Sequence, residues 1–139
     1  MTKTPRVVVG REDINTVTSA YNYANSLMYL KHFKEAKSLM RKTMPVTRRV
    51  LGDTNETTLR MRWIYAEALY QDDGASLDDL REAVETLEDA ERTARRVLGG
   101  AHPLMVGTEQ QLRKLRELLA AREALHEAKA TEAITPGDA

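Results

Sequence analysis

The sequence predicts an all-α protein built from repeated helical hairpins, and three observations lead to this fold class. The pentapeptide Arg-Arg-Val-Leu-Gly occurs at residues 48–52 and again at residues 95–99. Three residues after each glycine comes a residue that can start a helix, Asn55 or His102. Between these joints, apolar residues recur every three to four positions, as on one face of an α-helix. A recurring helix–glycine–helix junction indicates a recurring structural unit.

The joint consists of residues that end one helix and start the next. Its leucine buries the end of the first helix, and its glycine supplies the left-handed residue that commonly follows an α-helix. Pro103 suits the first position of the next helix, where no backbone N–H is needed. A degenerate third joint ends at Gly10, so 42 residues separate Gly10 from Gly52 and 47 separate Gly52 from Gly99. We attribute the longer second unit to a longer turn or to an extra helical turn at residues 76–80.

The periodicity places five helices, at about residues 13–29, 33–50, 56–70, 77–98 and 103–130. Pro45 should bend the second helix or remove one of its hydrogen bonds. Ser76 and Asp79 indicate a capping box at the start of the fourth helix, and Gly107 is tolerated in the fifth. The apolar stripes of the first four helices are Val17, Ala20, Ala24 and Leu27; Ala36, Leu39 and Met40; Leu59, Ala66, Leu69 and Tyr70; and Leu80, Val84, Leu87, Ala90 and Ala94.

This pattern predicts one repeat domain with short flanking segments. Residues 1–11 form a lead-in, in which three valines pack on the first helix pair, and residues 131–139 form a disordered tail. The repeat domain covers residues 12–130. Its repeats lie at about residues 12–50 and 54–97, and a capping helix lies at about residues 102–130.

The composition favours a cytoplasmic protein. There are no cysteines, which excludes a disulfide framework and thiol chemistry. No apolar run approaches the roughly 20 residues of a membrane span, and the start of the chain has no apolar signal region. The formal net charge is zero, so no bulk attraction to nucleic acid or to an anionic membrane is expected.

No motif predicts an enzyme, a cofactor or a metal site. The histidines His32, His102 and His126 lie far apart in the chain, without the spacing of a helical zinc site. The segment Asp72-Asp73-Gly74 lacks the ligand spacing of a calcium loop. We interpret the acidic residues of the fourth helix, including Glu82, Glu85 and Asp89, as a solvated helix face.

Charge is unevenly distributed along the chain, and two explanations remain open. Residues 1–50 hold ten Lys/Arg and three Asp/Glu, whereas residues 51–100 hold six and twelve. The basic second helix could bind nucleic acid or an acidic partner. Alternatively, it could stack beside the acidic fourth helix, since neighbouring units of a solenoid are in contact. We favour this second explanation.

The unit resembles the tetratricopeptide repeat, in the 42-residue version found in kinesin light chains and related scaffolds. The resemblance covers residues 9–119, most of the chain. Arg113 replaces the small alanine that the first two units keep as Ala24 and Ala66, so the third unit is only a half-repeat. The residues that carry the resemblance are the two joints, Leu98-Gly99 followed by His102-Pro103, Tyr65-Ala66 followed by Leu69-Tyr70, and Phe33-Lys34-Glu35-Ala36.

The resemblance implies a right-handed solenoid fragment of two helix pairs plus a C-terminal capping helix. It further implies a non-catalytic scaffold or adaptor for protein–protein interaction. Because two and a half repeats are close to the minimum for a solenoid, we expect a longer repeat array or a homo-oligomer. The ligand would be a peptide or partner segment held in the concave groove.

In this family the first helix of each repeat lines the groove. Carried over by position, the resemblance implies that the groove residues are Tyr21, Asn22, Asn25, Trp63, Ile64, Glu67, Gln110, Gln111 and Lys114. Asn and Gln can bond a peptide backbone, and Trp and Tyr provide the anchoring area that interfaces favour. For Trp63, packing between helices is an equally good explanation. We assign Tyr23, Tyr65 and Tyr70 to the core.

Overall fold

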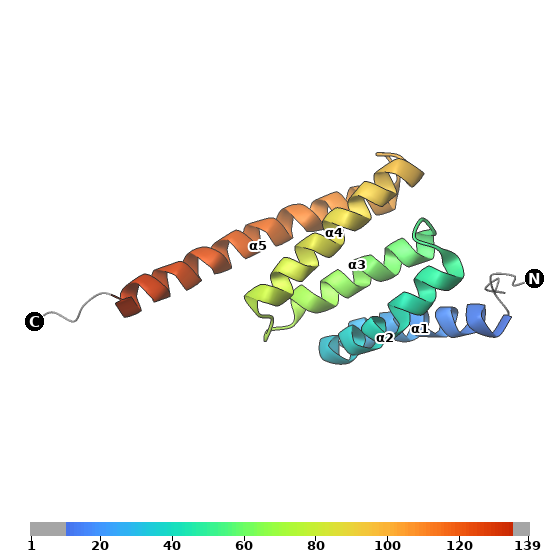
Figure 1. The fold of residues 1–139 in the computed structure, drawn as a ribbon, viewed down its shortest axis with the longest axis horizontal. Helices are drawn as coiled ribbons and strands as arrows, with labels where there is room; N and C mark the ends of the chain where they lie inside the picture. Colours follow the sequence, from blue (N-terminus) through green and yellow to red (C-terminus); the bar gives the residue numbers. More distant parts are fainter. Residues whose placement is uncertain (1–10, 135–139) are drawn as a thin grey trace, which may run out of the picture.

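The computed structural model describes residues 11–134, and within this range it contains five α-helices and no strand. The all-α fold class is confirmed. The lead-in valines and the last five residues of the expected tail lie outside the described range. The helices, shown in Figure 1, are α1 (Arg11–Tyr29), α2 (Phe33–Leu51), α3 (Glu56–Gln71), α4 (Leu77–Leu98) and α5 (Pro103–Ile134).

The helix bounds agree with the sequence prediction to within two residues, except at the end of α5. That helix continues to Ile134, so residues 131–134 are helical and the prediction that the tail starts at residue 131 is wrong. The physical reason is that the first helix breaker beyond residue 130 is Pro136. In the second helix, Pro45 lies inside an unbroken α2, where it has no N–H to donate to the preceding turn.

The helices pack as successive neighbours. Each helix contacts the next along the chain, and α1 and α5 also contact α3, which therefore lies at the centre (Figure 1). The odd-numbered helices thus form one row, and α2 and α4 cover the same side of α3. This is the arrangement of a helical repeat in which each hairpin packs on the one before it.

The two joints have the same backbone geometry. Gly52 has φ 85° and ψ 162°, and Gly99 has φ 84° and ψ 162°. Each glycine N–H donates to the carbonyl of the arginine four residues earlier, at 2.9 Å for Arg48 and 3.3 Å for Arg95. The expected positive φ is confirmed, but ψ is extended rather than left-handed helical. Only glycine occupies this region readily, because it lacks a Cβ.

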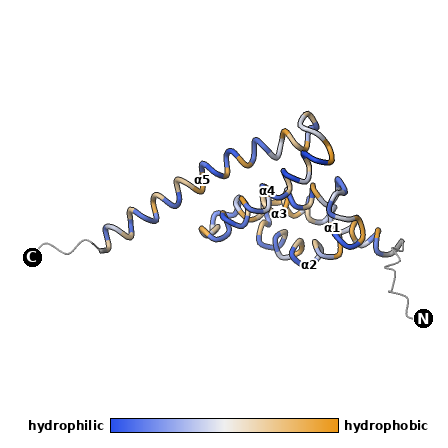
Figure 2. The backbone as a smooth tube through the Cα atoms, turned by 45° about the horizontal axis from the view of Figure 1, so that its top comes forward, coloured by the Kyte–Doolittle hydropathy of each residue, from blue (hydrophilic) through white to orange (hydrophobic). Residues whose placement is uncertain are grey.

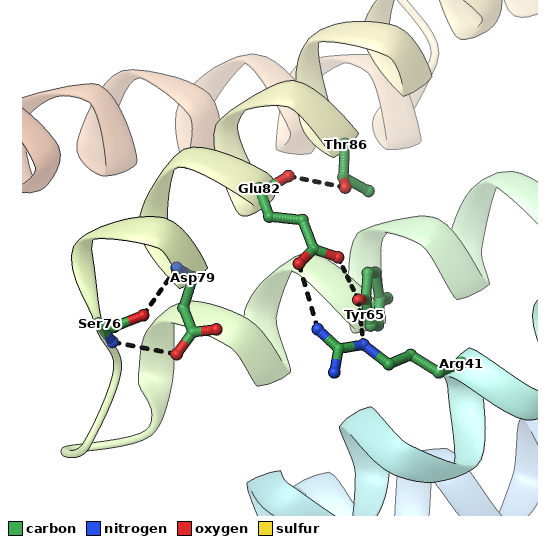
Figure 3. Close-up of polar contacts among 6 residues, drawn as sticks. All are labelled: Arg41, Tyr65, Ser76, Asp79, Glu82 and Thr86. Carbon is green, nitrogen blue, oxygen red and sulfur yellow. Dashed lines mark hydrogen bonds and ion pairs between the residues drawn. The ribbon is translucent and has the colours of Figure 1, made fainter.

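Side chains cap the helices that follow the turns. Asn55 Oδ1 accepts from the N–H of Thr57 at 2.8 Å, and His102 Nδ1 accepts from the N–H of Leu104 at 3.1 Å. Ser76 and Asp79 form the predicted capping box, with both hydrogen bonds present (Figure 3). The two joints are therefore followed by equivalent caps made from different residue types.

The apolar stripes form three clusters along the row of helices. One lies between α1, α2 and α3 around Ala24, Ala36 and Met40. A second lies between α3, α4 and α5 around Leu69 and Leu87. The third surrounds Leu59, Ala94, Leu104 and Met105 at the second joint. Of the stripe residues predicted from the sequence, all are buried except Leu39 and Tyr70, which are half-buried.

The last part of α5 extends beyond the other helices (Figure 1). Near the point where it leaves the other helices, Arg122 donates to the carbonyl of Ala75 in the turn between α3 and α4, and Glu123 pairs with Arg81. Every residue from 123 to 133 is exposed. Figure 2 shows hydrophilic and hydrophobic residues alternating along this segment. Among residues 11–134, no helix is both long enough and apolar enough to span a membrane.

Candidate partner-binding surfaces

The sequence-predicted groove residues lie on the three odd-numbered helices, in one set per helix. We call this surface the odd-helix face, comprising the α1 residues Tyr21, Asn22 and Asn25, the α3 residues Trp63, Ile64 and Glu67, and the α5 residues Gln110, Gln111 and Lys114. On α1, Asn22 and Asn25 are exposed and Tyr21 is half-buried. The Asn25 amide donates to the carbonyl of Tyr21 at 3.1 Å, which leaves its oxygen free to accept.

Trp63 is half-buried and packs against two of the core clusters. Its ring lies against α5 at Gly107, where an added Cβ would be 3.0 Å from Cη2. Its Nε1 atom is buried and has no hydrogen-bond partner among the described residues. Much of this side chain therefore fills space between α3 and α5. Ile64 likewise packs against the cluster between α1 and α2.

Glu67 is the half-buried acidic residue of the odd-helix face. Burial raises the pKa of its carboxyl group above the usual value of 4.5. Among residues 11–134 its carboxylate makes no hydrogen bond and no ion pair. A partly desolvated carboxylate in this state gains free energy from any N–H donor that reaches it.

On α5, Gln110 and Lys114 are exposed, whereas Gln111 is half-buried. The Gln111 side-chain oxygen accepts a hydrogen bond from the hydroxyl of Tyr70 on α3. Burial raises the pKa of Tyr70 to about 12, so this hydroxyl remains a donor at neutral pH. Of the two glutamines, Gln110 is therefore the one with both polar groups available to a ligand.

The tyrosines assigned to the core differ in their positions. Tyr65 and Tyr70 are half-buried and pack against the core clusters. Tyr23 is 54% exposed, so its assignment to the core is wrong. On the surface of α1, Tyr21 and Tyr23 lie on opposite sides of the buried stripe that contains Ala24, and Tyr23 projects into solvent.

A groove between α2 and α4, with α3 as its floor, was not predicted from the sequence. We call it the α2–α4 groove, and its volume is about 660 Å³. Its lining residues are Met40, Arg41, Met44, Pro45 and Arg48 from α2, Arg62 and Tyr65 from α3, and Glu85, Thr86, Asp89 and Arg92 from α4.

Three helices are linked at one end of this groove by Arg41, Tyr65 and Glu82 (Figure 3). Arg41 Nε donates to the Tyr65 hydroxyl at 2.9 Å, and Arg41 Nη2 lies 3.2 Å from Glu82 Oε1. The Tyr65 hydroxyl in turn donates to the other oxygen of Glu82. This ion pair joins basic α2 to acidic α4 across the groove, but the two helices do not pack directly on each other, so the prediction that they stack side by side is not confirmed.

At the other end of the groove lies a buried arginine. Arg62 is 4% exposed, and its guanidinium forms an ion pair with Asp89 on α4. Asp89 also lies 3.4 Å from Arg92 Nη2, while Arg48 Nε pairs with Asp53 at 3.3 Å. Burial lowers the pKa of Arg62, and the charge of Arg48 lowers it further. The Arg62 Nε–H is buried without an acceptor in the described part of the chain.

These contacts correct the interpretation of the acidic face of the fourth helix. Glu82 and Asp89 are half-buried and point to α2 and α3, whereas Glu85 is exposed. The spacing of Arg62 contained a usable signal. It lies four residues from Thr58 and four from Ala66, within the buried stripe of α3, where a charged residue needs a partner.

Part of the chain matches a known protein family. Residues 16–55 match the family model of the tetratricopeptide repeat. No curated protein and no solved structure matches the chain. The match covers most of α1, all of α2 and the first joint, and it supports the all-α tetratricopeptide-like helical repeat seen across α1–α5. Tetratricopeptide repeats generally act as non-catalytic scaffolds for protein–protein interaction, which implies protein partners.

Proposed function

We propose that this chain is a peptide-binding adaptor that holds an extended partner segment across its odd-helix face. The 42-residue spacing of Gly10 and Gly52 supports assigning its repeats to the kinesin light chain type. The absence of cysteines from the sequence agrees with assigning the protein to the cytoplasm. Binding would rest on shape and hydrogen bonding, without covalent chemistry.

The observation that carries this proposal is the state of Glu67. Its position in α3 corresponds to Asn25 in α1 and Lys114 in α5, so one polar residue of each odd-numbered helix stands at the same level of the repeat. Asn25 offers an acceptor, Lys114 offers donors, and the half-buried Glu67 lacks a donor. A peptide that lies across these three residues would supply an N–H to Glu67 from its backbone or from a basic side chain.

Trp63 contributes less than its residue type implies, because its ring packs on α5. Its replacement by alanine would leave a cavity as well as remove a contact. Asn22, Asn25 and Lys114 are exposed and are the better positions for testing binding without unfolding.

The experiment is an unbiased peptide-library screen with wild-type protein and the Glu67→Gln and Asn25→Ala variants. Each variant should weaken binding of the selected peptides about tenfold, the loss expected for one hydrogen bond to a charged or desolvated group. Titration calorimetry on the purified peptides measures this change.

The matched control is Glu127→Gln, which changes an exposed glutamate on the projecting part of α5 and should leave binding unchanged. Peptides that bind Glu67→Gln, Asn25→Ala and wild type with equal affinity would show that the odd-helix face is not the site.

A further inference from the structure

The α2–α4 groove is separate from the odd-helix face, and its chemistry indicates a different ligand group. We propose that this groove binds an acidic peptide segment, whose carboxylate is held by Arg62 with Arg48 and Arg92 at its rim. The peptide's neighbouring apolar side chain would lie along α2.

Arg62 is the anchor of the proposed site because it is a buried cation whose hydrogen bonding is incomplete. A guanidinium has five N–H donors. Asp89 satisfies the Nη2 atom, while the Nε–H has no acceptor among the described residues. An unsatisfied buried donor of a charged group costs free energy, which an incoming carboxylate would recover.

The charges around Arg62 are unbalanced in favour of an anion. At this end of the groove Arg48, Arg62 and Arg92 stand against two carboxylates, Asp53 and Asp89. The guanidinium of Arg48 is close enough to lower the pKa of Arg62. A ligand carboxylate between the arginines would relieve this repulsion, and arginine forks suit carboxylate geometry.

The opposite end of the groove has the reverse balance. There Arg41 is already paired with Glu82 and Tyr65, and Glu85 is exposed without an ion pair in the described part of the chain. The groove is therefore polarised along its length, so a ligand would place its carboxylate at the Arg62 end.

The apolar side of the groove favours a peptide over a nucleic acid. Met40, Met44 and Pro45 line α2, and methionines adapt to different apolar side chains. The carboxylates of Glu82, Glu85 and Asp89 stand along α4 and would repel a run of phosphates. A peptide with a single carboxylate beside an apolar side chain suits both sides of the groove: the apolar side chain packs on α2, and one carboxylate is repelled less by α4 than a run of phosphates would be.

The groove beside Arg62 is lined by side chains that are themselves exposed. The Nε atom is enclosed, but Asp89, which pairs with Arg62, and Arg92, which pairs with Asp89, have side chains that are 50% and 71% exposed. A ligand carboxylate would replace Asp89 on Arg62 while Asp89 remains paired with Arg92. After this exchange Arg48 pairs with Asp53, Arg92 pairs with Asp89, and Arg62 pairs with the carboxylate of the ligand.

The test uses two fluorescein-labelled octapeptide libraries with the full chain. Both fix a leucine at the centre; one fixes glutamate beside it and the other fixes glutamine. We expect the glutamate library to bind and its glutamine counterpart to bind at least about tenfold more weakly. Arg48→Gln and Arg92→Gln should each reduce binding about tenfold, the loss expected for one charge-assisted hydrogen bond.

Arg95→Gln is the matched control, because Arg95 occupies in the second joint the position of Arg48 in the first. It pairs with Glu91 and Glu109, away from the groove, so its replacement should leave binding unchanged. Glu67→Gln should also leave it unchanged, which separates this site from the odd-helix face. Arg62→Lys, checked for folding by its thermal transition, keeps the charge but should weaken binding because the planar fork is lost.

Three results would overturn the proposal. One is equal binding of the glutamate and glutamine libraries, and another is equal loss in Arg48→Gln and Arg95→Gln. The third is displacement of the peptides by a single-stranded oligonucleotide that binds more tightly, with an affinity that falls steeply with salt. That result would assign α2 to a polyanion instead.

Discussion

Gly107 on α5 faces the ring of Trp63 on α3 so closely that an added Cβ would lie 3.0 Å from Cη2. This contact joins two odd-numbered helices, as does the hydrogen bond from Tyr70 to Gln111. From the sequence, Gly107 is only a tolerated glycine within a helix, and Trp63 is explained equally well as a ligand anchor or by packing between helices. The structure explains the glycine at position 107, because the absence of a Cβ there leaves room for the indole ring of Trp63.

Replacement of Gly107 by alanine tests this contact. The added methyl group overpacks the ring, and this cost exceeds the gain in helix propensity, so we expect a net destabilisation of about 1 kcal/mol. In a Trp63→Leu background the methyl group has space, and Gly107→Ala should instead stabilise by up to about 1 kcal/mol. Urea unfolding of the four proteins gives both values, and an equal effect in the two backgrounds would contradict the packing.

The helices were predictable from the sequence because their ends depend on neighbouring residues. Asn55, Ser76 and His102 cap helices within three residues of themselves, and the glycines act through their own φ. The end of α5 was placed too early because the last helix lacks a local stop before Pro136.

The sites were less predictable because they depend on where distant helices lie. The resemblance placed nine residues on the odd-numbered helices, but sequence alone did not show that Trp63 packs on Gly107. The burial of Arg62 depends on both α2 and α4, which cover the same side of α3. A charged residue in a buried stripe indicates that an oppositely charged residue lies nearby, but the sequence does not show which residue it is.

The joint glycines provide a second prediction. No atom lies within 4 Å of a Cβ added at Gly52 or Gly99, so replacement by alanine meets only the backbone penalty of positive φ. We expect each substitution to destabilise by about 1–3 kcal/mol, and by similar amounts, because the dihedral angles are the same. Gly100→Ala is the control: Gly100 has open space and no positive φ, and an equal loss there would refute this explanation.

The cap at His102 provides a third prediction. Because Nδ1 accepts from the N–H of Leu104, this atom carries no proton and the proton resides on Nε2. His102→Ala should cost about 1 kcal/mol in the free energy of unfolding, whereas His102→Asn should cost little, since asparagine performs this role at Asn55. His126→Ala, on the exposed part of α5, should have no effect. Equal losses in His102→Ala and His102→Asn would argue against the cap.

The dependence of stability on pH provides a fourth prediction, centred on Glu67. The pKa of Glu67 is higher in the folded state than in the unfolded chain. Its contribution to the free energy of unfolding is therefore complete below the unfolded-state pKa and is lost as the pH rises through the folded-state pKa. The Glu67→Gln variant should therefore gain stability relative to wild type between acidic and neutral pH. Urea midpoints across that range measure the difference, and parallel curves would contradict it.

Asp79 should show the opposite sign and serves as the comparison. Its pKa is lowered chiefly by the hydrogen bond from the backbone of Ser76, so its contribution is present above the unfolded value near 3.8 and is lost as the pH falls through the folded value. Asp79→Asn should be less stable than wild type at neutral pH, and the two should converge in acid.

Because contacts between helices never reach further than two helices along the chain, the fold has few long loops to close before packing begins. Each hairpin can form from residues that are already near one another, and growth can proceed from α3 toward either end. Folding in microseconds to milliseconds is typical of such topologies. The same locality means that α1 can separate from the array while α4 and α5 keep all the surfaces they share. An end of the array can therefore open to a partner at the cost of its contacts with α2 and α3 rather than of the whole fold.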